Sequence, residues 1–218
     1  MTETTNYSPP VPSMARPIAG AISIAAFGAL ALQTLINDGS VLENFGGMAR
    51  FFTIWGNIAA CLLMGWIAAG FGVPRGVMAA LATALAVIAL VYWTLLSGDH
   101  NPEGLDRVTN QFHHTLVPVA FIGWWLVYTP SSPRVLPLLP TIMIPPLSYG
   151  AFALVFGELT GFYAYFLLDL PALGWTNFLI NMAGLAVFFA VMGAVLLKLK
   201  GVFNRLAPLD TDAPEAAA

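Results

Sequence analysis

The sequence predicts an all-α fold: a polytopic membrane protein built as a bundle of six transmembrane helices. Of its 218 residues, 58% are hydrophobic and only 9% are charged, and the mean hydropathy is +0.79. Soluble domains carry about 25% charged residues. Six apolar stretches also reach the length of about 20 residues that a membrane-spanning helix needs. We therefore expect an integral membrane protein.

The six expected helices form one transmembrane domain over residues 16–206. Their approximate ranges are 17–36, 49–70, 75–97, 108–128, 134–157 and 175–198. Residues 1–15 and 207–218 are polar or rich in proline and alanine, so we expect disordered cytoplasmic tails there.

A signal peptide is the alternative interpretation of the first apolar stretch. Arg16 precedes this stretch, and Ala29-Leu30-Ala31 resembles a cleavage site with small residues. The apolar run continues to Ile36, however, which favours a retained transmembrane helix.

Basic residues predict the orientation, because short loops rich in lysine and arginine stay in the cytoplasm. In a six-span arrangement one side collects Arg16, Arg75, Arg134, Lys198, Lys200 and Arg205. Arg50 and Arg107 fall on the other side, together with most of the acidic residues. Both termini are therefore expected in the cytoplasm, and the short loops fit a bacterial inner membrane.

Charge and cysteine content exclude several classes of function. With 8 Lys+Arg against 11 Asp+Glu, the chain has no basic excess to bind nucleic acid. Cys61 is the only cysteine, which excludes an intramolecular disulfide and a cysteine-rich metal site. The expected helix interiors carry almost no charge and no inverted repeat is visible, which disfavours a transporter.

Thr53 and His114 are the leading candidates for chemistry, because a weak alcohol nucleophile must be activated by a nearby base. Thr53 lies about 4.5 Å below Arg50, where the second helix enters the membrane. His113 and His114 lie roughly 9 to 11 Å below Arg107, where the fourth helix enters from the same face. The hydroxyl and an imidazole therefore share the outer leaflet, where ionisable groups are usually functional.

Residues near Thr53 and His114 in the sequence could support a site formed by these two side chains. Asn57 follows Thr53 by four residues on the same helical face, where its amide could orient the hydroxyl or donate to an oxyanion. His113 and His114 lie about 100° apart around the helix, so at most one points into a shared pocket. Pro118 leaves the carbonyl of His114 without its helical donor and is expected to bend the helix there.

Other polar and aromatic groups have two interpretations. Tyr92, Asn181 and the aromatic segment 157–165 could line a cavity, or could serve as interface anchors and packing groups. The histidines do not suggest haem, because axial ligands face each other from different helices and His100 lies in a loop. No metal and no cofactor is predicted.

The chain resembles a known family, the androgen-induced-gene and ADTRP-like (FAR-type) membrane proteins, and especially their bacterial six-span relatives. The resemblance covers nearly the whole chain. It rests, in order, on Arg50-Phe51-Phe52-Thr53 with Asn57, Leu96 with Asn101-Pro102 and Gly104, His114-Thr115 with Pro118, and Leu159-Thr160-Gly161-Phe162-Tyr163 with Asp169. Two positions depart from the family pattern: Gly56 stands in place of serine and Ala164 in place of proline.

The resemblance implies an intramembrane threonine hydrolase of lipid esters, with Thr53 as the nucleophile and His114 as the base. Asn57, His113, Asn181 and Tyr92 would support the site or bind substrate. Membrane lipids and a small amphipathic lipid substrate are the expected partners, and no oligomeric state is predicted. The alternative is a non-enzymatic protein, a small transporter or an assembly subunit, in which the threonine, asparagine and histidine groups pack helices together.

Overall fold

The computed structural model describes residues 11–98, 100–132 and 135–206, and its regular elements are helices. In chain order they are α1 (Ala15–Leu35), α2 (Val41–Met48), α3 (Phe52–Ala68), α4 (Arg75–Val91), η1 (Tyr92–Leu96), α5 (Gly104–Gln111), η2 (Phe112–Leu116), α6 (Val117–Tyr128), η3 (Leu136–Leu138), α7 (Leu139–Thr160), η4 (Phe166–Leu168) and α8 (Leu170–Leu206). Each of the six expected apolar stretches coincides with one or more of these helices. The predicted all-α class is therefore confirmed.

Four helical segments are long and apolar enough to cross a membrane: Ala15–Leu35, Arg75–Leu96, Leu136–Thr160 and Leu170–Leu206. The bent pair of α2 and α3 would make a fifth. Among the described residues, the continuous helical segment from α5 to α6 is not one of them, because α5 is polar. Four to five helices that can span a membrane are consistent with an integral membrane protein.

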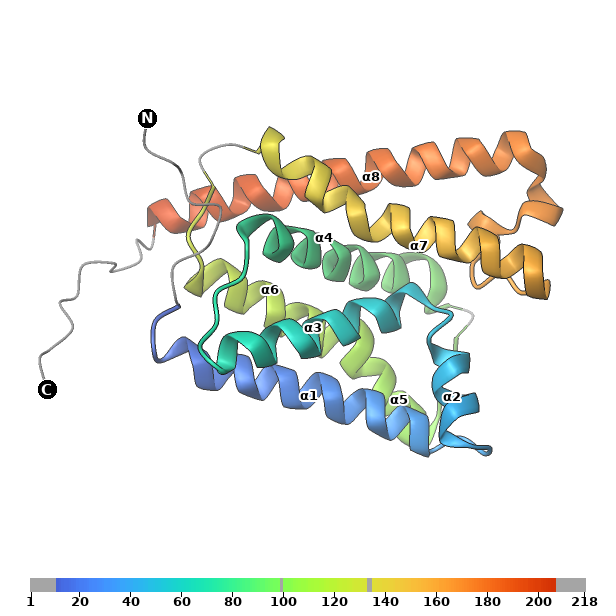
Figure 1. Cartoon of the computed structure of the whole chain (residues 1–218), viewed down its shortest axis with the longest axis horizontal. Helices are drawn as coiled ribbons and strands as arrows, with labels where there is room; N and C mark the ends of the chain where they lie inside the picture. The colour runs from blue at the N-terminus through green and yellow to red at the C-terminus, as the bar shows by residue number, and fades with distance from the viewer. Residues whose placement is uncertain (1–10, 99, 133–134, 207–218) are drawn as a thin grey trace, which may run out of the picture.

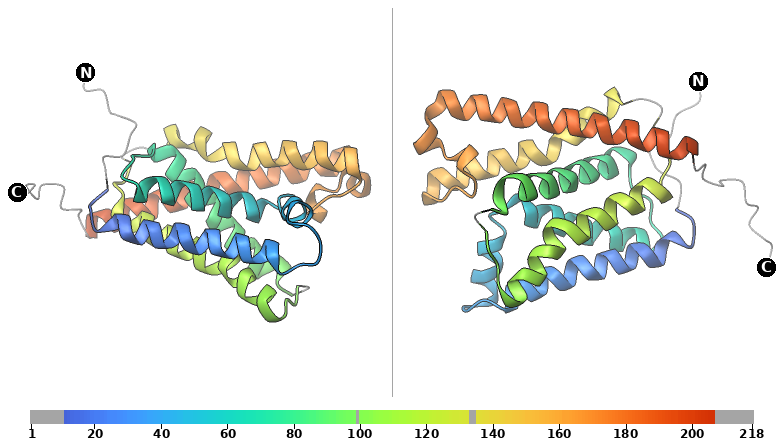
Figure 2. Two further views of the ribbon diagram at one scale, coloured as in Figure 1. Left: turned by 60° about the horizontal axis from the view of Figure 1, so that its bottom comes forward. Right: turned by 180° about the vertical axis from the view of Figure 1, so that it is seen from behind.

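The long helices run side by side as one bundle (Figure 1). α1 packs along α3, and α4 lies centrally in contact with α3, α6, α7 and α8. α7 and α8 form a hairpin against α4, as both views of Figure 2 show. α1 begins and α8 ends at one end of the bundle, whereas α2 lies across the other, which is called the α2 end below.

Apolar side chains fill the inside of this bundle and also cover its outside. The largest fully buried apolar side chains include Met64, Met78, Leu85, Phe121 and Ile142. Large apolar side chains exposed on the outside include Ile24, Phe27, Leu62, Val187 and Val191. A soluble monomer rarely exposes so much contiguous apolar surface, whereas a lipid-facing surface requires it.

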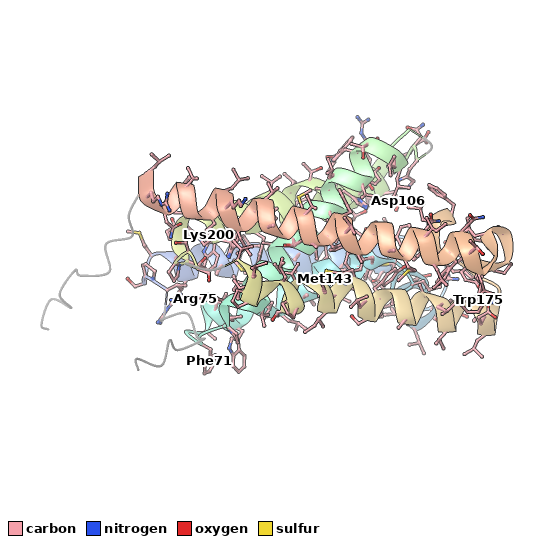
Figure 3. The ribbon with its side chains drawn as sticks, turned by 90° about the horizontal axis from the view of Figure 1, so that it is seen from above. Phe71, Arg75, Asp106, Met143, Trp175 and Lys200 are labelled. Atoms are coloured by element: carbon pink, nitrogen blue, oxygen red, sulfur yellow. The ribbon has the colours of Figure 1, made fainter. Side chains whose placement is uncertain are left out.

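A buried lysine joins α8 to α6 at the end of the bundle opposite α2. Lys200 of α8 is 1% exposed, and its Nζ donates to the carbonyl oxygens of Trp125 at 2.6 Å and Leu126 at 3.2 Å. These carbonyls belong to the last turn of α6, where helical donors are missing. Figure 3 shows Lys200 and Arg75 at this end and Asp106 and Trp175 towards the other.

Helix α2 was not expected from the apolar pattern, because it is short and polar on one side. Its start is nevertheless encoded, because Ser40 and Glu43 form a reciprocal capping box. The axes of α2 and α3 differ in direction by 105°, so α2 lies across the bundle rather than along it. Leu42 points outward and is 82% exposed, while Asn44 turns inward and donates to the carbonyl oxygens of Thr34 and Asn37.

Two helices change to wider π-helical turns at the α2 end. η1 continues α4, and η2 joins α5 to α6. The bend expected at Pro118 therefore takes the form of a π-helical turn just before this proline, which is the second residue of α6. Such turns occur frequently at functional sites.

The two expected tails lie mostly outside the described residues. Of residues 1–15, the structure describes 11–15: Val11 packs against the core and Ala15, fully buried, begins α1. Residues 207–218 lie outside the described ranges.

Candidate active site

Thr53 and His114 meet at the α2 end. Thr53 is the second residue of α3, directly after the sharp turn from α2, and His114 lies in η2. Thr53 Oγ1 is 3.3 Å from His114 Nε2, which is within reach of a loose hydrogen bond. Thr53 and His114 are 61 residues apart in the sequence. The structure therefore brings together the two residues that the sequence singled out.

The orientation of His114 is fixed from two sides. Its Nδ1 is 3.2 Å from the carbonyl oxygen of Asn110. Because a carbonyl oxygen only accepts, the neutral ring carries its hydrogen on Nδ1 and presents the lone pair of Nε2 to Thr53. The ring of Tyr92 stacks on the imidazole, with centroids 3.8 Å apart and planes 19° apart. This is the nucleophile, base and orienting group arrangement of an activated alcohol.

Asn110 connects Tyr92 to the same site. Its Nδ2 donates to the Tyr92 hydroxyl at 2.7 Å, while its backbone carbonyl holds His114. The Tyr92 hydroxyl also lies 3.1 Å from His100 Nδ1. Tyr92 is 4% exposed, so it is a buried wall of the site rather than an interface anchor.

Asn57 joins the two halves of the site through the backbone. Its side chain is fully buried, and Nδ2 donates to the carbonyl oxygens of Thr53 at 2.9 Å and His113 at 3.1 Å. The carbonyl of His113 accepts this bond because the amide of Val117 reaches back to Phe112 and Pro118 has no amide hydrogen. Both amide hydrogens of Asn57 are thus used on carbonyls, so in this geometry Asn57 positions α3 against η2 and does not contact the hydroxyl or serve as an oxyanion donor.

Replacing Asn57 by leucine is expected to lower the melting temperature of the detergent-purified protein. The change leaves the buried carbonyl of His113 without its donor, at a cost of about 1–3 kcal/mol, whereas the carbonyl of Thr53 keeps the backbone amide of Asn57 within α3. Asn177→Leu is the matched control, because Asn177 is exposed and donates only to Leu173 within α8. A melting temperature equal to wild type for Asn57→Leu would contradict this positioning role.

His113 and Asn181 have other surroundings. His113 is 3% exposed and its ring nitrogens have no hydrogen-bond partner within the described ranges, so His114 and not His113 contacts Thr53. Asn181 Nδ2 donates to the carbonyl oxygen of Leu167 at 3.0 Å, which ties α8 to the connection from α7. The structure does not bring Asn181 to Thr53.

Tyr165 is a site residue that the sequence does not single out within the aromatic segment 157–165. Its hydroxyl accepts from the amide of Phe52 at 3.2 Å and lies beside the hydroxyl groups of Thr53 and Tyr149. Tyr149 in turn donates to the carbonyl oxygen of Arg50 at 2.8 Å. The aromatic segment 157–165 contained the signal, but only the folded connection between α7 and α8 places its last residue on the first turn of α3.

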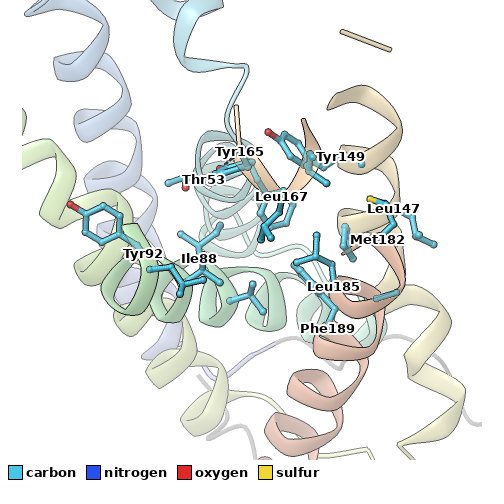
Figure 4. Close-up of a pocket in the computed structure, with 18 of the residues that line it drawn as sticks. Thr53, Ile88, Tyr92, Leu147, Tyr149, Tyr165, Leu167, Met182, Leu185 and Phe189 are labelled. Atoms are coloured by element: carbon cyan, nitrogen blue, oxygen red, sulfur yellow. Dashed lines mark hydrogen bonds between the residues drawn. The ribbon is translucent and has the colours of Figure 1, made fainter. Parts of the chain in front are cut away.

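Two cavities meet at Thr53. The larger, called the polar chamber, has a volume of about 700 Å³ and is lined by Gln33, Asn37, Glu43, Asn44, Arg50, Phe51, Thr53, Tyr92, His100, Asp106, Asn110, His113, His114 and Tyr165, among others. The smaller, called the apolar groove, has a volume of about 110 Å³ and is lined by Thr53, Ile88, Tyr92, Leu147, Tyr149, Tyr165, Leu167, Met182, Leu185 and Phe189, among others (Figure 4). Thr53, Tyr92 and Tyr165 line both. The hydroxyl therefore stands between a polar and an apolar compartment.

Within the part of the chain that the structure describes, no three His, Cys, Asp or Glu side chains are grouped closely enough to hold a metal ion.

Comparison of the chain with models of known protein families, with curated proteins and with solved structures gives no match. The fold and the site define the protein physically: an all-helical chain with four to five helices that can span a membrane, and a Thr–His pair between two cavities.

Proposed function

We propose that this protein is an intramembrane hydrolase that cleaves a lipid ester, with Thr53 as nucleophile and His114 as general base. The observation that carries the proposal is the 3.3 Å approach of Thr53 Oγ1 to His114 Nε2, with Nδ1 of the same ring held by a carbonyl. The family resemblance of the motifs around Thr53 and His114 supports the same assignment.

The reaction follows from these positions. His114 Nε2 takes the proton of Thr53, and Oγ1 attacks the ester carbonyl carbon. As the tetrahedral intermediate collapses, the bond to the alcohol oxygen breaks, and His114 returns its proton to that oxygen. Water then gives a proton to His114 and attacks the acyl-threonine, and collapse releases a fatty acid and restores the Thr53 hydroxyl.

Tyr165 is the group best placed to stabilise the oxyanion, because its hydroxyl lies beside Thr53 while the amides of Asn57 and Asn181 are bound to carbonyls. Tyr165→Phe is expected to lower kcat about 10²-fold or more, the usual effect of removing one oxyanion donor. Ester turnover by the purified variant measures this. Tyr163→Phe is the control, because Tyr163 lies two residues away, lines neither cavity and donates to Glu158. Equal losses in both variants would remove Tyr165 from the mechanism.

An amphipathic lipid fits the two compartments. Its acyl chain would occupy the apolar groove, and its polar part the polar chamber, which leaves the ester at Thr53. In the proposed topology all six apolar stretches cross a bacterial inner membrane, and α2 lies at its outer surface. α1 and α4 begin, and α8 ends, at the end opposite α2 (Figure 1). These helix ends carry Arg16, Arg75, Lys198, Lys200 and Arg205, which supports cytoplasmic termini. The ester would reach Thr53 laterally from the outer leaflet.

Covalent labelling tests the proposal. The purified protein is treated with an alkyl fluorophosphonate, digested, and analysed by mass spectrometry. We expect the phosphonyl group on the peptide that contains Thr53, because an activated hydroxyl attacks phosphorus as it attacks an ester. Folded protein that takes no label and hydrolyses no ester would instead favour the non-enzymatic alternative, in which these polar groups hold helices together.

A further inference from the structure

We infer that the polar chamber binds the headgroup of a zwitterionic phospholipid, which carries one phosphate and one ammonium group. This inference rests on the proposed function, because hydrolysis at Thr53 places the polar part of the lipid in the chamber. It names the substrate class, which the Thr–His pair alone does not.

The chamber contains fixed charges of both signs. Arg50, Glu43 and Asp106 line it, and within the described ranges Arg50 forms no ion pair with either carboxylate. A volume of about 700 Å³ is ample for a phosphate and an attached amine. Opposite charges that share a cavity without neutralising each other provide complementary contacts for a ligand with both charges.

Two contacts orient the guanidinium group of Arg50 so that it can bind an anion. Its Nε donates to the carbonyl oxygen of Gly47 at 3.0 Å, and its guanidinium carbon lies 4.4 Å from the centre of the Phe162 ring. These contacts fix the plane of the guanidinium and leave its terminal amino groups for a second partner. A planar pair of N–H donors matches two phosphate oxygens.

The carboxylates are each anchored through one oxygen. Asp106 Oδ1 accepts from Gln33 Nε2 at 2.7 Å, and Gln33 Oε1 accepts in turn from the Thr109 hydroxyl. Glu43 Oε2 accepts from the amide and the hydroxyl of Ser40. The second oxygen of each carboxylate is therefore oriented by a neighbour and can accept from an ammonium group.

The balance of charge favours a zwitterion over a simple anion. The chamber has two carboxylates and one arginine, so a headgroup that is only negative meets more repulsion than attraction. An ammonium group relieves this, and the rings of Tyr92, Tyr165 and Phe51 in the same wall also attract cations.

Lipid retention by the Thr53→Ala protein tests the inference, because this variant cannot consume its ligand by the proposed reaction. The purified variant is equilibrated with equal amounts of phosphatidylethanolamine and phosphatidylglycerol, and bound lipid is measured by native mass spectrometry. We expect the variant to retain about tenfold more phosphatidylethanolamine than phosphatidylglycerol, because this ratio corresponds to the free energy of one charge-assisted hydrogen bond. Adding Arg50→Gln should reduce both lipids, whereas adding Glu43→Gln with Asp106→Asn should reduce phosphatidylethanolamine about tenfold and leave phosphatidylglycerol unchanged or higher.

Matched controls lie outside the chamber. Arg107→Gln and Asp38→Asn remove the same charges at the same end of the bundle, and neither residue lines the chamber, so the lipid ratio should stay at its Thr53→Ala value. Equal retention of the two lipids, or a ratio that does not respond to the carboxylate variants, would overturn the inference.

The same experiment separates this inference from the proposed function. Wild-type protein that cleaves an uncharged nitrophenyl ester but shows no phosphatidylethanolamine preference is a hydrolase without this headgroup subsite. A clear phosphatidylethanolamine preference in protein that neither cleaves esters nor takes the fluorophosphonate label supports the subsite and removes the hydrolase.

Discussion

Replacing Thr53 by alanine is expected to abolish ester hydrolysis and fluorophosphonate labelling. Oγ1 is the atom that attacks the acyl carbon, and among the described residues no other hydroxyl lies within hydrogen-bond distance of His114 Nε2. Loss of a nucleophile that acts together with its base lowers kcat by at least about 10³-fold. Release of fatty acid by purified protein, measured at saturating ester, checks this.

Two variants make the result specific. Thr53→Ser keeps a hydroxyl in the same place and should keep a measurable part of the activity and the label. Thr94→Ala removes an exposed threonine hydroxyl that donates only to Leu90 in its own helix, so it should leave both readouts unchanged. Full turnover by Thr53→Ala would show that Thr53 is a packing group.

His114→Ala is expected to have the second largest effect, a fall in kcat of about 10²–10⁴-fold, because the Thr53 hydroxyl loses its proton acceptor. The melting temperature should fall as well, since the ring also stacks on Tyr92 and contacts Asn110. Kinetics separate the two roles: groups that act as a unit are not additive. The double variant Thr53→Ala with His114→Ala should therefore be no slower than Thr53→Ala alone.

A packing role for His114 predicts a different pattern. Activity would then fall only in proportion to the fraction of unfolded protein, and lowering the assay temperature would restore it. If His114→Ala remained as active as wild type at a temperature where both are folded, another group would have to activate Thr53.

The meeting of Thr53 and His114 could be anticipated because both residues lie near the ends of apolar segments on one face of the expected bundle. The depth of each residue in the membrane follows from its position along the helix and the rise of about 1.5 Å per residue, so it can be estimated from the sequence. Which helices touch is set by side-chain packing instead. The contact between α3 and η2 needed the folded chain, whereas the choice of His114 over His113 came from the motif resemblance and agrees with the 3.3 Å approach of His114 to Thr53.

The roles of residues that depend on backbone geometry could not be predicted from the sequence. Asn57 was placed on the correct face, but its two donors bind carbonyls, one of them freed by the π-helical turn and Pro118. Asn181 reaches the connection before α8 and not the site. Tyr165 joins the site only because the chain turns back after Gly161, whose φ of 75° is the left-handed conformation that glycine favours.

The π-helical turn η2 gives the site an unusual dependence on chain length. A π-helical turn holds one residue more than an α-helical turn, so η2 behaves as a single-residue insertion in the helix that runs from α5 to α6. Deleting one residue from η2 would restore the α-helical count and rotate the residues before the deletion by about 100° relative to those after it. The stack of Tyr92 on His114 would be lost while the hydrophobic pattern of both helices stayed intact. Homologous chains that lack the extra residue of η2 should therefore keep the bundle and lose the Thr–His pair, even where both Thr53 and His114 have counterparts in the sequence.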